Sequence, residues 1–321
     1  MPTNNSHSNP GRIPHPRLTR ILRAAVVLMV GAVPAIASAQ AIYVADANGF
    51  TSSTAGSVGQ FNLNGSVVNA SLITGIGAPF GLAVTSTDVY YTDNNNGVVG
   101  DYSTATMGLN SSLIAISEPT GIAVSSPLIY VASDADNTVK EYDTGGTPLS
   151  TSFITGLNGP RQIALSPSGT LLFVANNGNG TVGEYSATTG SPVSPMLLSG
   201  LNGVTSVAVS PNGLDLYVGT DGNSTVGEYS IATGMPVIAS LITGVVPEYL
   251  QVFGSSLYVD DFSGNIDQFS LSGPALNVPL ISNLNDPLSF GVIPEPATAA
   301  LLATAAGGLV ALRPRRCTAP I

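Results

Sequence analysis

Short apolar segments alternate with turns rich in glycine, asparagine and aspartate through most of this 321-residue chain. Within many segments apolar and polar residues alternate with a period of two, as they do in strands that bury one face. Residues 171–186 are representative, because two strand-like runs flank a turn of asparagines and glycines. The pattern predicts an all-β body without long helices.

Four signals recur in a fixed order along this body. They are an apolar strand, a strand with an aromatic residue, an alternating strand that ends on an aromatic residue, and a brief apolar pair. The third signal occurs six times, and its copies end on Phe61, Tyr102, Tyr142, Tyr185, Tyr229 and Phe269. Successive end residues are 41, 40, 43, 44 and 40 residues apart. A regular repeat near forty residues with four strands is typical of the blade of a β-propeller.

A four-stranded sheet cannot bury both of its faces alone, whereas copies packed side by side bury them against each other. Six copies predict a six-bladed β-propeller of four-stranded antiparallel blades over residues 40–293. The body begins on the second signal and ends on the first, at residues 287–292, so the last strand must complete the first blade in a one-plus-three closure. A two-sheet sandwich made from the same strands is the alternative.

The first 39 residues have the composition of a secretory signal peptide. Arg17, Arg20 and Arg23 precede an apolar run that ends on the small residues Ala37 and Ala39. A basic flank, a short apolar core and a small-residue site predict cleavage before Gln40. A membrane anchor is the alternative. The single cysteine lies at position 317, so the body has neither a disulfide nor a free thiol.

Residues 294–321 contain a Pro-Glu-Pro motif, an apolar stretch over residues 297–312 and a cluster of arginines. As a helix the stretch would measure about 24 Å, which is short of a ~30 Å hydrocarbon core. Arginines directly after it would stay cytoplasmic and orient the preceding chain outward. We expect a short transmembrane helix that acts transiently, with a plain C-terminal anchor as the alternative. The motif and the stop-transfer arginines are Pro294, Glu295, Pro296, Arg313, Arg315 and Arg316.

These three elements, in this order, resemble the PEP-CTERM sorting signal. The resemblance implies that an exosortase, a membrane protease-transpeptidase of bacteria that produce exopolysaccharide, removes the tail at or near Pro-Glu-Pro. Residues 166–186 and 210–230 resemble NHL and YVTN repeats, and this resemblance covers residues 42 to 292. It implies a propeller but leaves activity open, because such repeats occur in lactonases, lyases, adhesins and scaffolds.

Charge and residue types narrow the function. Between residues 40 and 292 only Lys140 and Arg161 oppose 18 acidic residues, a net charge of 2 − 18 = −16. This charge repels phosphate backbones and excludes nucleic acid as a partner, but permits cations or neutral sugars. Both histidines, His7 and His15, precede the predicted cleavage site. Without them no Ser-His or Cys-His nucleophile can form, so we do not expect an enzyme.

Carboxylates are the remaining route to chemistry. Metal-dependent lactonases of the gluconolactonase type hold a divalent cation with glutamate, asparagine and aspartate oxygens at the axis, a ligand set that suits Ca²⁺. Hairpin turns explain the same residue types here, so we expect no cofactor and keep weak Ca²⁺ binding as the alternative. The candidates are Asp93, Asp134, Asp136, Asp221 and Asp260, with Asp261 and the amides Asn94, Asn95, Asn137, Asn176, Asn177 and Asn223.

Two further groups of charged residues stand out. Arg161 begins an inner strand, where we expect it to neutralise a buried charge rather than bind a ligand. A carboxylate recurs just before the aromatic residue of the third signal, at Asp101, Glu141, Glu184 and Glu228. Identical placement in successive blades indicates an architectural role, either exposed or between blades.

Together these observations predict a protein exported across the bacterial inner membrane to the cell surface or extracellular matrix. We expect an exosortase-sorted binding or scaffold protein associated with exopolysaccharide. Its expected partners are the exosortase, the secretion machinery, exopolysaccharide or surface proteins, and transiently the membrane through the C-terminal helix. A metal-dependent lactonase or other hydrolase of the gluconolactonase type is the alternative.

Overall fold

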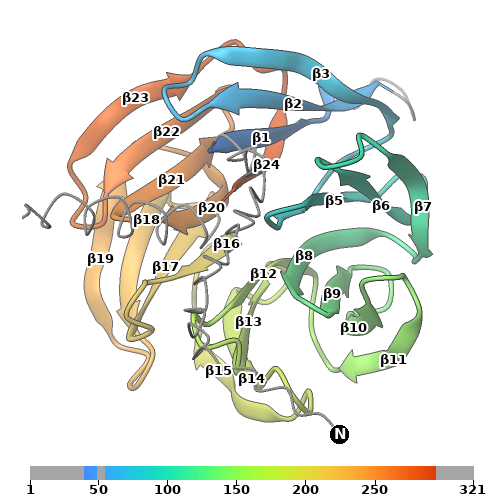
Figure 1. The fold of residues 1–321 in the computed structure, drawn as a ribbon. Coiled ribbons are helices and arrows are strands. Elements are labelled where there is room, and N and C mark those ends of the chain that lie inside the picture. The colour runs from blue at the N-terminus through green and yellow to red at the C-terminus, as the bar shows by residue number, and fades with distance from the viewer. Residues whose placement is uncertain (1–39, 49–54, 294–321) are drawn as a thin grey trace, which may run out of the picture. The chain divides into compact units, whose positions relative to one another are not determined.

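A computed structural model describes residues 40–48 and 55–293. These residues form six four-stranded antiparallel sheets arranged as blades around an axis, as Figure 1 shows. The predicted six-bladed β-propeller is therefore confirmed, and the sandwich alternative is wrong.

The blades are numbered in chain order, and their strands run from the axis outward. Blade 1 contains β24 (Pro287–Val292), β1 (Ala41–Asp46), β2 (Gly56–Asn62) and β3 (Val67–Ile76). Blade 2 contains β4 (Leu82–Val84), β5 (Asp88–Asp93), β6 (Val98–Ser103) and β7 (Leu109–Ala115). Blade 3 contains β8 (Pro119–Ser125), β9 (Leu128–Ser133), β10 (Thr138–Asp143) and β11 (Pro148–Ile154).

The second half of the ring repeats this order. Blade 4 contains β12 (Pro160–Leu165), β13 (Leu171–Asn176), β14 (Thr181–Ser186) and β15 (Pro192–Leu198). Blade 5 contains β16 (Val204–Val209), β17 (Asp215–Thr220), β18 (Thr225–Ser230) and β19 (Pro236–Thr243). Blade 6 contains β20 (Pro247–Phe253), β21 (Ser256–Asp261), β22 (Asn265–Ser270) and β23 (Ala275–Ile281).

Blade 1 joins the two ends of the described chain. Strand β24 pairs antiparallel with β1, with Val292 opposite Ile42, and the two strands lie side by side in Figure 1. The ladder continues past the strand, because Ile293 N donates to Ala41 O at 3.0 Å. The one-plus-three closure is confirmed, and within blade 1 it consists of a backbone hydrogen-bond ladder.

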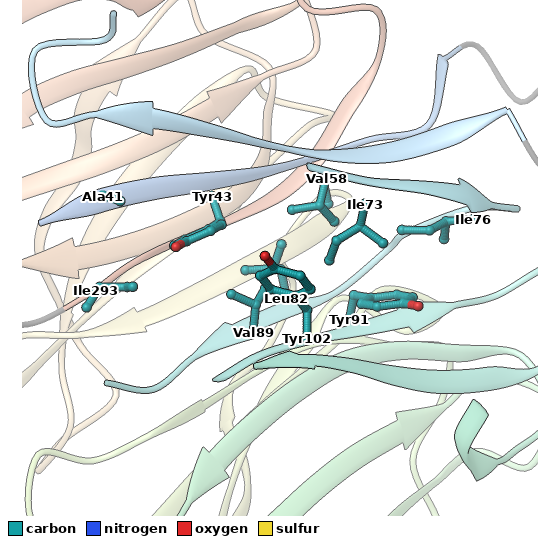
Figure 2. Packing of buried hydrophobic residues seen from close by; sticks show 11 residues of the cluster. Ala41, Tyr43, Val58, Ile73, Ile76, Leu82, Val89, Tyr91, Tyr102 and Ile293 are labelled. Carbon is teal, nitrogen blue, oxygen red and sulfur yellow. The ribbon is translucent and has the colours of Figure 1, made fainter. Parts of the chain in front are cut away.

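The hydrophobic core lies between the blades. In Figure 2, Tyr43 and Ile73 of blade 1 pack with Leu82, Val89 and Tyr91 of blade 2 in one cluster of buried side chains. The other buried clusters likewise combine residues of neighbouring blades. Because each face is covered by a neighbour, a blade cannot form its core without the ring.

A glycine two residues before the third-strand aromatic residue shapes this packing. A Cβ placed on Gly183 would lie 2.6 Å from the Tyr185 ring, and one on Gly227 would lie 2.7 Å from the Tyr229 ring. Each ring therefore lies back over its own strand, which only glycine permits. The shared sequence Thr-Val-Gly-Glu-Tyr-Ser of β14 and β18 thus specifies a ring position as well as a strand.

The repeated carboxylates of the third strand lie opposite the second strand. Glu184 is paired with Phe173 in the neighbouring strand, and its side chain is buried. Burial raises the pKa of the Glu184 carboxyl, as it does for the equivalent acids Asp101, Glu141 and Glu228. Glu184 is buried and Asp101, Glu141 and Glu228 are half-buried, so the fully exposed alternative is wrong for this series.

The predicted targeting segments, residues 1–39 and 294–321, lie outside the described residues, so their predictions stay predictions. This applies to Ala37, Ala39, Pro294, Glu295, Pro296, Arg313, Arg315 and Arg316. Within the part of the chain that the structure describes, we find no helix with the length and hydropathy needed to cross a bilayer.

The closing strand generates a stability prediction. Phe290 of β24 is fully buried, and its ring lies 5.4 Å from that of Tyr249 and 6.2 Å from that of Tyr258. We expect Phe290→Ala to lower the free energy of unfolding by ~3–5 kcal/mol, because it leaves a cavity at the joint between blades 6 and 1. Urea unfolding at constant pH measures the loss. Leu276→Ala, on the exposed face of β23, is the control and should change stability by less than ~0.5 kcal/mol. Similar losses in both variants would contradict this account.

Candidate functional site at the axial mouth

The six inner strands begin at one end of the axis and bring equivalent residues together there. One residue from each blade lines a shallow depression of about 20 Å³. We call this depression the axial mouth. Its ring consists of Leu288, Phe80, Thr120, Arg161, Thr205 and Glu248.

One ion pair crosses the axial mouth. Arg161 Nη1 of blade 4 lies 3.3 Å from Glu248 Oε2 of blade 6, so the pair spans blade 5. Burial raises the pKa of the Glu248 carboxyl; the Arg161 charge opposes this rise, and the charges of Asp221 and Asp286 add to it. Arg161 is thus a charge partner, as expected from its position, although 39% of its side chain stays exposed against 13% for Glu248.

Two large side chains close the channel directly below the mouth. Gln162 Nε2 donates to Leu250 O at 2.8 Å, and its Oε1 accepts from Val207 N at 3.1 Å and from Leu250 N at 3.3 Å. Tyr249 Oη donates to Leu82 O of blade 2 at 3.2 Å. Burial raises the pKa of Tyr249 to about 12, so this phenol remains a donor at physiological pH. The layer ties blades 2, 4, 5 and 6 together.

The remaining members of this layer are small, which leaves room for the two large ones. A Cβ on Gly121 would lie 2.3 Å from Arg161 O, so the inner strands of blades 3 and 4 approach too closely for any other residue. Below the layer lies a cavity of about 230 Å³ with mainly aliphatic walls, including Ile122 and Val207. The channel is therefore blocked, and the mouth is a surface feature.

A second ring surrounds the mouth at the start of the turns after the second strands. Each blade contributes one residue to this ring. The backbone N–H of that residue donates to a carbonyl just before an inner strand, for example Asn94 N to Ala78 O at 2.9 Å. The side-chain amides of Asn94 and Asn177 reach Pro119 O and Val204 O of the next blade. We call this set the turn ring. It consists of Ala47, Asn94, Asp134, Asn177, Asp221 and Phe262.

The five predicted carboxylate candidates do not converge. Asp134 and Asp221 belong to the turn ring of blades 3 and 5. Asp93 accepts from Gly77 N and from the Asn96 amide, and so organises a turn. Within residues 40–48 and 55–293 no three acidic, histidine or cysteine side chains are placed to hold a metal ion together.

Asp136 is likewise engaged locally. It forms an ion pair with Lys140, and the Lys140 ammonium lowers the pKa of the Asp136 carboxyl. The turn interpretation therefore describes Asp93 and Asp136 well.

Asp260 is different from the other candidates. Its side chain is completely buried in β21, and neither carboxylate oxygen has a hydrogen-bond partner among the described residues. Burial raises its pKa well above the usual range, and the negative charges of Glu248, Asp261, Asp286 and Asp46 add to this rise. The corresponding β5 residue of blade 2 is Thr92, which instead donates to Thr120 O at 2.9 Å. Asp260 thus places a buried carboxyl without a hydrogen-bond partner close to Glu248 of the axial mouth.

Glu248, Gln162 and Tyr249 were missed as site residues. An alignment of the six inner strands could have found them, because all three occupy the second or third position of an inner strand. The third-strand aromatic residues set the repeat but lie away from the axis, so they do not mark this layer.

Comparisons with solved structures agree with this fold. One chain of the crystal structure of a nidogen/laminin complex aligns with a TM-score of 0.59 and 15% identity, over 79% of this chain and 97% of that chain. A gluconolactonase from Xanthomonas campestris aligns with a TM-score of 0.52 and 15% identity, over 61% of this chain and 73% of that chain. No family model and no curated protein matches the sequence. At this identity the likeness extends to the fold alone.

Asp260 generates a pH-dependent prediction. Its folded pKa lies above the unfolded value, so between these two values the folded state binds more protons and the free energy of unfolding falls as pH rises. We expect Asp260→Asn to be more stable than the parent protein above about pH 4, by up to ~1.4 kcal/mol for each pH unit up to the folded pKa. Thermal unfolding from pH 4 to pH 8 measures this difference.

Asp143→Asn is the matched control for this experiment. Asp143 accepts from Gly145 N and Thr147 N, and these hydrogen bonds hold the pKa of its carboxyl below the usual value. This substitution should therefore give no stabilisation that grows with pH. A constant difference between Asp260→Asn and the parent protein at all pH values would contradict the assigned ionisation.

Proposed function

We propose that this protein is an exported, exosortase-sorted β-propeller that acts as a non-catalytic binding or scaffold component of the cell surface or extracellular matrix. Its proposed partners outside the cell are exopolysaccharide and surface proteins. The observation that carries this proposal is the shallow axial mouth. Sites that enclose a small molecule usually measure roughly 300–1,000 Å³, whereas this depression measures about 20 Å³ above the Gln162–Tyr249 layer. The Arg161 side chain, which is 39% exposed, would therefore contact a partner that lies across the ring and is not enclosed by it.

The chemistry of this face suits a polymer rich in hydroxyl groups. The turn ring and mouth combine amides, carboxylates and one guanidinium, which are hydrogen-bonding partners for hydroxyls. Phe262 is 61% exposed beside them and provides an apolar surface for a sugar ring. The net charge of −16 between residues 40 and 292 disfavours polyanions. A neutral or weakly charged polysaccharide fits best.

The proposed sorting route is compatible with the closure of the ring. Ile293 is buried and hydrogen-bonded to Ala41, and the Pro-Glu-Pro motif begins at the next residue. Exosortase cleavage within residues 294–296 would remove the apolar helix and leave every bond of the closing ladder in place. The proposal thus allows export, transient membrane anchoring and release without opening the propeller.

Asp260 favours one second candidate, a metal-assisted lactonase or hydrolase. Its unpartnered carboxyl lies near Glu248, and a gluconolactonase shares the fold. Calcium titration monitored by thermal unfolding, with a lactone hydrolysis screen, separates the candidates. A calcium-dependent rise in Tm and lactone turnover that both vanish in Asp260→Asn would support the enzyme. We expect neither effect in the parent protein.

The binding proposal predicts that one face of the ring matters. We expect Phe262→Ala to weaken co-sedimentation of the full-length protein with exopolysaccharide at least about fivefold, because burying an aromatic ring contributes ~1–3 kcal/mol. Leu214→Ala is the matched control, since Leu214 is 63% exposed in the turn between β16 and β17 at the opposite end of the inner strands. Equal weakening in both variants, or none in either, would contradict the assignment of this face.

A further inference from the structure

A second cavity lies between blades 3 and 4, away from the axis. It measures about 420 Å³ and opens between the end of β11 on one side and β14 and β15 on the other. The two blades contact each other beside it, since Tyr130 Oη of blade 3 donates to Ala187 O of blade 4 at 2.7 Å. Within blade 3 the Tyr130 ring lies 5.5 Å from that of Phe153, which lines the cavity. Figure 1 shows these blades as neighbours in green and yellow-green. Its volume lies within the range of roughly 300–1,000 Å³ typical of small-molecule sites.

The cavity walls carry no charged side chain, in a body with a strong negative charge. Phe153, Pro192, Pro195 and Met196 provide apolar surface. A site of this kind gives an ion no electrostatic attraction, so it selects neutral molecules. It also offers apolar faces that can cover the C–H face of a sugar ring.

Three polar groups of the lining are free to bind a ligand. Tyr185 is only 5% exposed, and burial raises the pKa of its hydroxyl, so the phenol stays protonated and can donate a hydrogen bond. Asn179 Oδ1 accepts from Thr181 Oγ1 at 2.8 Å, which leaves the Asn179 amide N–H groups available. Thr155 adds an exposed hydroxyl from the loop after β11. Together these three residues offer two hydroxyls and one amide as hydrogen-bonding groups for a ligand.

We propose that this inter-blade cavity binds one neutral hexose unit. The sugar ring packs on Phe153, the prolines and Met196, while its hydroxyls bond to Tyr185, Asn179 and Thr155. The inference deepens the proposed function and rests on it for the source of the sugar, since a polysaccharide presents such units at its ends and branches. It names a lateral site that is separate from the axial mouth.

The chain provides matched controls at the next two interfaces, with Tyr229 between blades 4 and 5 and Thr243 on the outer strand of blade 5. Tyr229 stands in the same Thr-Val-Gly-Glu-Tyr-Ser sequence as Tyr185, and its ring lies over Gly227 as that of Tyr185 lies over Gly183. Thr243 precedes Gly244 at the end of β19, as Thr155 precedes Gly156 after β11, and both threonines are exposed. The variants Tyr229→Phe and Thr243→Trp therefore repeat the same chemical changes outside the cavity.

The test uses saturation-transfer difference NMR on the full-length protein with methyl glycosides of glucose, galactose and mannose, and with glucuronate as the charged comparison. We expect a signal for at least one neutral glycoside and a weaker one for glucuronate. Tyr185→Phe should lower the affinity about threefold to tenfold by removing one hydrogen bond. Thr155→Trp should abolish the signal by filling the cavity, whereas Tyr229→Phe and Thr243→Trp should retain it.

Each contrary result overturns the inference. No signal for any neutral glycoside, equal signals in Thr155→Trp and the parent protein, or equal binding of glucuronate would each exclude a neutral hexose site. Thermal unfolding of all four variants shows whether a lost signal reflects a lost fold, and Tyr185→Phe keeps the ring that packs between the blades.

Polysaccharide co-sedimentation of the same variants separates this inference from the proposed function. Polysaccharide binding that survives in Thr155→Trp, together with absent glycoside signals in the parent protein, would leave the proposed function standing and remove the cavity as its site. Glycoside signals without any polysaccharide binding would remove the proposed function and keep the cavity.

Discussion

The antiparallel ladder between β24 and β1 is the constraint on which the rest of the molecule depends. Each blade buries its two faces only because it has a neighbour on both sides, and the first and last blades would lack one neighbour in an open array. Pairing of Val292 with Ile42, continued by the Ile293–Ala41 hydrogen bond, supplies the missing contact. No disulfide reinforces the ring, since the only cysteine is Cys317. Hydrogen bonds and apolar packing must therefore hold it closed.

The same closure sets the geometry of the axis. Six inner strands converge closely enough that Gly121 has no room for a Cβ, while Gln162 and Tyr249 fill the space that remains. Gln162 and Tyr249 form hydrogen bonds from one blade to another, so they stabilise the ring rather than line a passage. The Arg161–Glu248 pair lies above this layer, where solvent still reaches the guanidinium. Burial, together with the charges of neighbouring acidic residues, raises the pKa values of Glu248 and Asp260, and the Arg161 charge opposes this rise at Glu248.

Much of the fold could be predicted from the sequence because aromatic and aliphatic residues recur at the same positions of each repeat. The regular spacing from Phe61 and Tyr102 to the later aromatic residues gave the number of blades. The order of the strand signals at the two ends predicted that β24 pairs with β1. Details at single residues were harder to predict. The first signal of blade 2 includes Phe80, but β4 begins only at Leu82, because Gly81 N–H donates to the Thr92 hydroxyl.

The site was less predictable than the fold, because its residues share a layer rather than a motif. Aspartates in turns are candidate metal ligands in a sequence, yet Asp93 and Asp136 form hydrogen bonds or ion pairs within or next to their own turns. Glu248 and Gln162 lie 86 residues apart, and only the ring places them in neighbouring layers of the axis. The cavity between blades 3 and 4 combines residues of β11 with residues of β14 and β15, and only the packing of the two blades brings them together.

The scarcity of basic residues has a further consequence outside the cell. Between residues 24 and 312 the only peptide bonds that a trypsin-like protease recognises follow Lys140 and Arg161. Lys140 lies in the paired strand β10, and Arg161 lies at a register shift in the inner strand β12, where the inner strand of blade 3 packs closely against it. Neither segment can extend into a protease active site while the ring is folded. The folded ring therefore offers this class of enzyme no accessible cleavage point, a form of durability that comes from where two cations are placed.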